Sequence, residues 1–188
     1  MSLTLRQAIP QDAEAIAEVH VYAWQAAYAD IVPGDFLAQL EVKKRAAWWY
    51  WHLSENQSLV MVALSGEKLV GWISFGVSRD DDAAGAGEIC ALYVLPAYWR
   101  QGVGSALMRA IVPQSRTFKS VSLWVLKQNK RACDFYLQIG FEPDGAEKIV
   151  AIGGAELTEI RYRRLPNQAL LPTTTAVTPA ASHPSRQP

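Results

Sequence analysis

The sequence has few cysteines and no long apolar run. Only two of its 188 residues are cysteines, Cys90 and Cys133, and we expect both to be buried small side chains rather than a disulfide or a metal site. No stretch approaches the ~18 apolar residues of a membrane helix. The N-terminus also lacks a basic segment followed by an apolar one. These absences predict a soluble, cytoplasmic protein that does not bind membranes.

An excess of charge is also absent. Lysine plus arginine and aspartate plus glutamate number 18 each, which argues against a nucleic-acid binder dominated by phosphate contacts. The three histidines do not show metal-ligand spacing, so no metal site is expected. Half of the residues are apolar and 19% are charged, which is typical of a globular domain.

The character of the chain changes after residue 165. Residues 1–165 are enough for one domain with a substantial core. Residues 166–188 hold five of the ten prolines and a single formally charged residue, Arg186, and they show no periodicity. We predict that 166–188 is a disordered tail rich in Pro, Thr and Ala.

The pattern of apolar residues predicts elements in the order β, α, α, β, β, β, α, β, α, β, β. Strands are expected over 3–8, 59–64, 69–77, 89–94 and 120–125, and from 141 into a hairpin of 149–152 and 155–163. Helices are expected after 10, over 34–53, after 103 and after 129, and 79–87 is expected to be a flexible loop. This order implies a mixed sheet with helices on both faces.

In residues 88–108 a buried strand leads through Pro96 into a loop with two glycines and then a helix. Such a helix start has unpaired N–H groups and partial positive charge, and Gly102 and Gly104 let a diphosphate approach them. No Lys-Ser/Thr follows the glycines, which disfavours a nucleoside-triphosphate loop. Leu107 stands where a dinucleotide fold needs a third glycine, so a nicotinamide-dependent enzyme is also disfavoured.

Two motifs together resemble the GNAT N-acetyltransferase superfamily. The first is Pro96 followed by an aromatic-Arg-Gln-Gly-Val-Gly-Ser-Ala-Leu run, with Trp99 at the first place of the family's Gln/Arg-x-x-Gly-x-Gly/Ala. The second, over 129–141, matches Asn-x-x-Ala-x-x-Phe-Tyr-x-x-x-Gly-Phe. The resemblance covers about residues 3–164. It implies an α/β fold with a mixed, mostly antiparallel central sheet, splayed central strands and helices on both faces.

The resemblance implies acetyl-CoA as cosubstrate, with its pantetheine arm between the splayed strands. The implied contacts are Leu92, Tyr93, Val94, Arg100, Gln101, Gly102, Val103, Gly104, Ser105, Asn129 and Tyr136. Asn129 and Tyr136 are two helical turns apart, so their side chains face the same way. For Arg100, a solvated surface cation is the alternative interpretation.

Two residues are candidates for catalysis. By family resemblance, Tyr136 protonates the departing thiolate; the alternative is a core aromatic with a bonded hydroxyl. Glu88 opens the central strand and corresponds to a glutamate that acts as general base in several family members. The alternative is a strand-edge carboxylate, with ordered water accepting the proton.

The acceptor site is the least defined part. His20, Trp24 and Tyr28 recur every four residues, and Trp72 and Trp124 are further candidates. The favoured interpretation of the helical residues is an aromatic stripe packed on the sheet, with His20 satisfied locally. Glu156 and Glu159 could attract a cationic substrate, but exposed carboxylates are usually only solvated.

We therefore predict an N-acetyltransferase in which a primary amine attacks acetyl-CoA directly in a ternary complex. A small-molecule acceptor is favoured over a protein N-terminus, and a non-catalytic acyl-CoA-binding or sensor module is the alternative function. The oligomeric state stays open, with a homodimer as one option.

Overall fold

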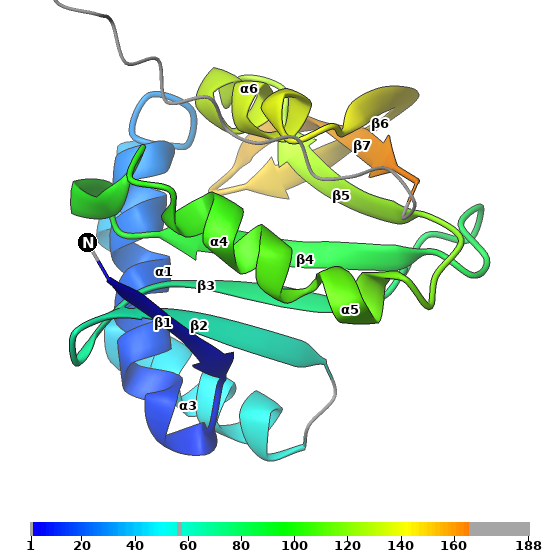
Figure 1. Cartoon of the computed structure of the whole chain (residues 1–188). Coiled ribbons are helices and arrows are strands. Elements are labelled where there is room, and N and C mark those ends of the chain that lie inside the picture. Colours follow the sequence, from blue (N-terminus) through cyan, green and yellow to red (C-terminus); the bar gives the residue numbers. More distant parts are fainter. Residues whose placement is uncertain (1, 56–57, 166–188) are drawn as a thin grey trace, which may run out of the picture.

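The computed structural model describes residues 2–55 and 58–165 and shows a seven-stranded sheet with helices against both faces (Figure 1). The strands are β1 (Leu3–Gln7), β2 (Leu59–Ser65), β3 (Lys68–Val77), β4 (Gly87–Val94), β5 (Val121–Leu126), β6 (Glu142–Ile152) and β7 (Ala155–Arg164). The helices are α1 (Ala13–Ala27), α2 (Gly34–Ala38), α3 (Val42–Ser54), α4 (Val103–Ala110), α5 (Val112–Ser115) and α6 (Lys130–Gln138), with 3-10 turns at Pro10–Asp12 and Pro96–Tyr98. The predicted tail, 166–188, lies outside the described residues.

The strands lie in the order β1-β2-β3-β4-β5-β7-β6. Among the described strands, β4 and β5 are the one neighbouring pair that runs parallel, and every other pair is antiparallel. The parallel pair is possible because α4 and α5 connect the end of β4 to the start of β5. The predicted fold class, a mixed and mostly antiparallel sheet with helices on both faces, is therefore confirmed.

Each face of the sheet carries its own core. α1 and α3 pack on one face, where Trp49 and Trp72 meet edge to face at 4.6 Å between ring centroids. α4 and α6 contribute to the core on the other face, where Leu107 and Tyr136 join Ile89 from β4. Figure 1 shows α4 and α5 in front of the strands and α1 behind them. Within the described residues, no helix combines the length and the apolar character needed to cross a membrane.

The single helix predicted over 34–53 is wrong, because the chain forms α2 and α3 with a break between them. Glu41, just before α3, has extended backbone (φ −107°, ψ 123°). Leu37 of α2 is buried with the β6–β7 hairpin, whereas Trp49 of α3 is buried against Trp72. We attribute the break to these two different cores, because one straight helix would not reach both of them.

A β-bulge in β4 overturns the prediction for one of the cysteines. Ser74 of β3 pairs with Ala91, and Phe75 pairs with Ile89, so Cys90 is the extra residue. Cys90 is exposed as a result, whereas Cys133 is buried as predicted. The bulge also changes which side chains point toward the core under α4.

Gly87 allows two phenylalanine rings to pack over the start of β4. A Cβ at this position would lie 2.5 Å from Cζ of Phe75 and 3.1 Å from Cδ2 of Phe118. We expect Gly87→Ala to lower the free energy of unfolding by about 1–3 kcal/mol, because the rings must move out of their packing. Gly76→Ala is the matched control, since its nearest neighbour would be 3.8 Å away. Urea denaturation measures both, and equal stability of the two variants would contradict this packing.

Candidate active site

The parallel pairing of β4 with β5 stops before either strand ends. It runs from Gly87 and Val121 to Ile89 and Leu123, while β4 continues to Val94 and β5 to Leu126. The central strands are therefore splayed, as predicted. Beyond Ile89, the edge of β4 that faces β5 has main-chain groups outside the ladder, which are open to a ligand.

The direction of the main chain in β4 shows which groups lie on that edge. The N–H of Leu95 donates to the Val70 carbonyl at 2.9 Å, so residue 95 points toward β3. Because main-chain direction alternates along a strand, Leu92 and Val94 point the other way, toward the opening. The Val94 carbonyl accepts a hydrogen bond from the Trp99 indole at 2.7 Å. Among the described residues, Leu92 has no partner in the β4–β5 ladder.

The turn before α4 depends on left-handed backbone. Gly102 has φ 82° and ψ 0°, and Arg100 has φ 57°. A Cβ at residue 102 would meet nothing within 4 Å, so glycine is needed for its conformation rather than for space. The Gly102 carbonyl accepts from the N–H of Ala106. The N–H groups of Val103 and Gly104 belong to the first turn of α4 and lie at its positive end.

Two contacts join this turn to α6. A Cβ on Gly104 would lie 3.3 Å from the Phe135 ring, so this glycine serves the approach of the two helices. The Arg131 guanidinium lies 3.3 Å from the centroid of the Trp99 ring. Burial lowers the pKa of Arg131, and the Arg100 charge lowers it further. Two guanidiniums thus lie near the start of α4.

Arg131 was missed by the sequence reasoning. Its place in the second motif puts it at the start of α6, but no local pattern indicates that it stacks on Trp99, 32 positions earlier. Trp99 departs from the family pattern, and it ties the end of β4 to α6 through its indole N–H and its ring.

Tyr136 lies in the core beside the opening. It is 8% exposed, with the rings of Phe141 and Tyr162 at 6.1 and 6.4 Å. Burial raises the pKa of Tyr136, so its phenol stays protonated at neutral pH. Asn129 begins the same helix, and its Oδ1 accepts from the N–H of Ala132 at 3.2 Å. Its amide NH2 group hydrogen-bonds with the Tyr28 hydroxyl and has a second hydrogen to donate.

Phenols from three elements come together at this place. Burial raises the pKa of Tyr28 at the end of α1, and hydrogen bonding with Tyr93 and Asn129 opposes that rise. The pKa of Tyr93 is raised chiefly by burial and also by Tyr28. Tyr28 also acts on the pKa of Tyr136. The structure therefore gathers Tyr28, Tyr93, Asn129 and Tyr136.

Three of the remaining acceptor candidates form one aromatic cluster. The His20 ring lies 5.7 Å from Trp24, 5.7 Å from Trp72 and 5.1 Å from Tyr93. Trp72 is only 1% exposed and is a core residue. Both ring nitrogens of His20 are buried without a hydrogen-bond partner among the described residues, so the expected local satisfaction of His20 is wrong. Trp124 lies outside this cluster.

Glu88 is buried and engaged by a single arginine. It is 2% exposed, and its carboxylate accepts from the backbone N–H, Nε and Nη2 of Arg79, at 3.0, 3.1 and 2.5 Å. The pKa of Arg79 is raised chiefly by this pairing. Glu88 thus holds the start of the β3–β4 loop against the sheet.

The same loop is tied to Trp124 and Arg161, although it was predicted to be flexible. Both carboxylate oxygens of Asp80 lie 3.1 Å from the Trp124 indole nitrogen, which donates to them. Arg161 is 5% exposed, and its guanidinium donates to Asp80, Asp82 and Asp144. The Lys148 Nζ lies over the Trp124 ring and pairs with Glu159, and we call Trp124, Asp80, Arg161, Glu159 and Lys148 the Trp124 wall.

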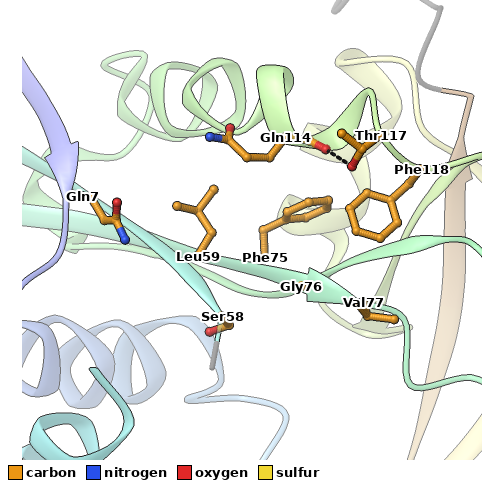
Figure 2. Close-up of a pocket in the computed structure, with 9 residues that line it drawn as sticks. All are labelled: Gln7, Ser58, Leu59, Phe75, Gly76, Val77, Gln114, Thr117 and Phe118. Atoms are coloured by element: carbon orange, nitrogen blue, oxygen red, sulfur yellow. Dashed lines mark hydrogen bonds between the residues drawn. The ribbon is translucent and has the colours of Figure 1, made fainter. Parts of the chain in front are cut away.

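A pocket of about 430 Å³ lies elsewhere in the fold (Figure 2). Its lining residues are Gln7, Ser58, Leu59, Phe75, Gly76, Val77, Gln114, Thr117 and Phe118. The pocket adjoins the end of β3 that pairs with Gly87, whereas α4 begins beyond the opposite end of β4. The described residues that line it include no titratable side chain and none of the predicted site residues, so this pocket does not offer acid–base chemistry.

The burial of His20 predicts how the stability of the fold changes with pH. Burial, with a contribution from Arg45, lowers the pKa of His20 from 6.5 to about 4. Between these values the unfolded chain binds more protons than the folded chain, so stability falls as the pH falls. The loss attributable to His20 is about 3 kcal/mol. Denaturant titrations at pH 7 and pH 4.5 should show a smaller loss in His20→Phe.

His52→Gln is the matched control, since His52 contacts Ser58 instead. Its effect on the pH dependence should be smaller. An unchanged pH dependence in His20→Phe would contradict the burial of a neutral imidazole at this place.

Comparison with known proteins agrees with this geometry. The model of the acetyltransferase (GNAT) family matches residues 20–141. YuaI, an uncharacterised N-acetyltransferase of Bacillus subtilis, is 32% identical over 164 residues, which is 84% of this chain and 90% of that protein.

Two solved structures share the fold. The PaiA N-acetyltransferase of Thermoplasma acidophilum, in complex with coenzyme A, has a TM-score of 0.66 at 20% identity and covers 88% of this chain and 99% of that one. YncA of Salmonella typhimurium, with acetyl-CoA, has a TM-score of 0.67 at 20% identity and covers 92% and 98%. The family match spans more than half of the sequence, and YuaI is similar over most of it: this chain belongs to the GNAT acetyltransferase family.

Proposed function

We propose that this chain is an N-acetyltransferase that moves an acetyl group from acetyl-CoA to a primary amine. One observation carries the proposal. The unpaired edge of β4 leads from Ile89, in the core cluster that contains Tyr136, to the N-terminus of α4. Acetyl-CoA supplies the acetyl group as a thioester. The coenzyme A and acetyl-CoA in the two similar structures support this choice of ligand.

The residues of the opening fit an anionic ligand that carries amides. The N–H groups of Val103 and Gly104 and the guanidiniums of Arg100 and Arg131 offer positive charge and donors for a diphosphate. The Gln101 side chain donates to the Ala97 carbonyl, so residue 101 contributes its main chain. The free main-chain groups of Leu92 and the amide NH2 of Asn129 suit the amides of a pantetheine arm.

We assign the proton donor to Tyr136. Its raised pKa keeps the hydroxyl protonated, and a protonated phenol can give its proton to a departing thiolate. The alternative, a purely structural Tyr136, requires its hydroxyl to be hydrogen-bonded within the core. Hydrogen bonds contribute to the pKa shift of Tyr28, whereas the causes of the Tyr136 shift are burial and charge on Tyr28 and Cys133.

For the general base, we favour ordered water over Glu88. Both carboxylate oxygens of Glu88 already accept hydrogen bonds from Arg79, so a proton from the amine must displace that guanidinium. An alkylamine has a pKa of about 10 and reaches the site mostly as ammonium. Water beside the Trp124 wall can take its proton before attack.

Direct attack by the amine in a ternary complex suits the surroundings of Cys90. The residue Cys90 is exposed at the bulge, but burial around its sulfur and the Glu88 charge raise the pKa of the thiol. A protonated thiol is a poor nucleophile, so an acyl-cysteine intermediate is disfavoured. A small amine fits the aromatic cluster of His20, Trp24 and Tyr28, with the carboxylates Glu156 and Glu159 on the closing hairpin.

The activity is tested by screening amines for the release of free thiol from acetyl-CoA. We expect at least one small primary amine to be acetylated in preference to a peptide N-terminus. Calorimetric titration with acetyl-CoA and with NADH measures binding independently of turnover. Binding of NADH and not of acetyl-CoA would overturn the proposal.

Tyr136→Phe tests the proton donor. We expect kcat to fall about a hundredfold or more, because the thiolate must leave unprotonated, while the Kd for acetyl-CoA changes little. Tyr162→Phe is the matched control, since it removes a hydroxyl from the same core cluster on β7 and should leave kcat near the native value. Normal binding with an undiminished rate in Tyr136→Phe would support the non-catalytic acyl-CoA sensor instead.

Glu88→Gln separates the two candidates for the base. If water accepts the proton, kcat should fall less than about tenfold and the shape of kcat/KM against pH should persist. The variant should also loosen the β3–β4 loop, because the amide nitrogen of glutamine cannot accept from Arg79. A much larger fall, with loss of the native pH dependence, would make Glu88 the base.

A further inference from the structure

We propose that Lys148 is an internal acceptor, acetylated on its own side-chain amine at the opening between β4 and β5. The inference rests on the proposed function, and it adds a modification site within the chain itself. It follows from one primary amine of the protein that already lies on the Trp124 wall.

The position of Lys148 is set by three strands. Its Nζ lies 3.9 Å from the centroid of the Trp124 ring and 3.4 Å from Oε2 of Glu159. Lys148 of β6 pairs with Glu159 of β7, and Glu159 pairs with Leu126 of β5. Residues paired across a sheet share a face, so the lysine extends over β7 toward β5 on the side occupied by Trp124 and Leu126.

Trp124 marks the border of the opening. It follows Leu123, the last β5 residue that pairs with β4, and its indole N–H is held by Asp80. Arg79, the neighbour of Asp80, holds Glu88 at the start of β4. The amine of Lys148 therefore lies against the first side chain beyond the end of the β4–β5 pairing.

Lys148 is held loosely enough to move. Its ion pair with Glu159 is 3.4 Å long, against 2.8 Å for the pair of Lys127 with Glu147. Its side chain is 41% exposed, and an ion pair or cation–π contact at such a site is weak. Release of the ammonium into water, where it can lose its proton, thus meets little resistance.

The reaction is the same as for an external amine. Lys148 loses a proton to water, and its nitrogen forms a bond to the thioester carbonyl carbon while the carbon–sulfur bond breaks. The thiolate takes a proton from Tyr136, the nitrogen loses its second proton to water, and the phenol regains one. The product is neutral acetyl-lysine, which no longer pairs with Glu159 or binds the Trp124 ring as a cation.

The test follows acetylation of the full chain by acetyl-CoA with no amine added. Peptide mass spectrometry, after digestion with a protease that does not cut at lysine, compares Lys148 with Lys127. Lys127 is the matched internal control, because it is also ion-paired and its side chain is 52% exposed. We expect Lys148 to react at least about tenfold faster, since it is held beside the site. The half-time should not depend on protein concentration.

Reaction with acetic anhydride, in the absence of acetyl-CoA, supplies a readout that does not use the cosubstrate. In this reaction the exposure of each lysine alone decides its rate of modification, so Lys127 should be modified at least as fast as Lys148. Trp124→Leu should slow the reaction of Lys148 with acetyl-CoA and leave that of Lys127 unchanged. Lys148→Arg should remove the fast increase in intact mass, which assigns it to this residue.

Equal rates at the two lysines, or a rate that rises with protein concentration, would overturn the inference. It also fails if an added amine is acetylated while Lys148 stays unmodified, and that result leaves the proposed function intact. Absence of acetyl-CoA binding and of thiol release with every amine would instead refute the proposed function, and the inference with it.

Discussion

The structure depends on where two parallel strands stop pairing. β4 and β5 share a ladder only as far as Ile89 and Leu123, and unpaired main-chain groups inside a protein are unfavourable without another partner. The bulge at Cys90 lies at this point, and the Trp99 indole satisfies the carbonyl of Val94. The remaining unsatisfied edge of β4 is what a ligand with amides can complete.

Both ends of the opening are fixed by the packing on the face that carries α4 and α6. At one end, Gly102 in the left-handed region starts α4, whose first N–H groups lie at the positive end of the helix. Toward the other end, Tyr136 is buried in the core and stays protonated. A diphosphate and a thiolate are different anions, so a helix terminus suits the first and a proton donor suits the second.

The features that the sequence predicted arise from neighbouring residues. The strand before Pro96, the turn at Gly102 and the capped helix at Asn129 each have a local pattern, and the structure contains all three. The contacts that the sequence did not predict join residues far apart in the chain. Arg131 stacks on Trp99, and Asp80 ties the β3–β4 loop to Trp124. His20 was expected to have a polar partner, but burial among aromatic rings leaves it neutral instead.

The central claim is that acetyl-CoA completes the free edge of β4. Amide hydrogen exchange with and without acetyl-CoA measures this most directly, since it reports main-chain hydrogen bonds residue by residue. The account predicts new protection at residues 92 and 94, which face the opening, and at residues 102–104. Protection confined to the pocket of Gln7, Phe75 and Phe118, with no change in β4, would contradict it.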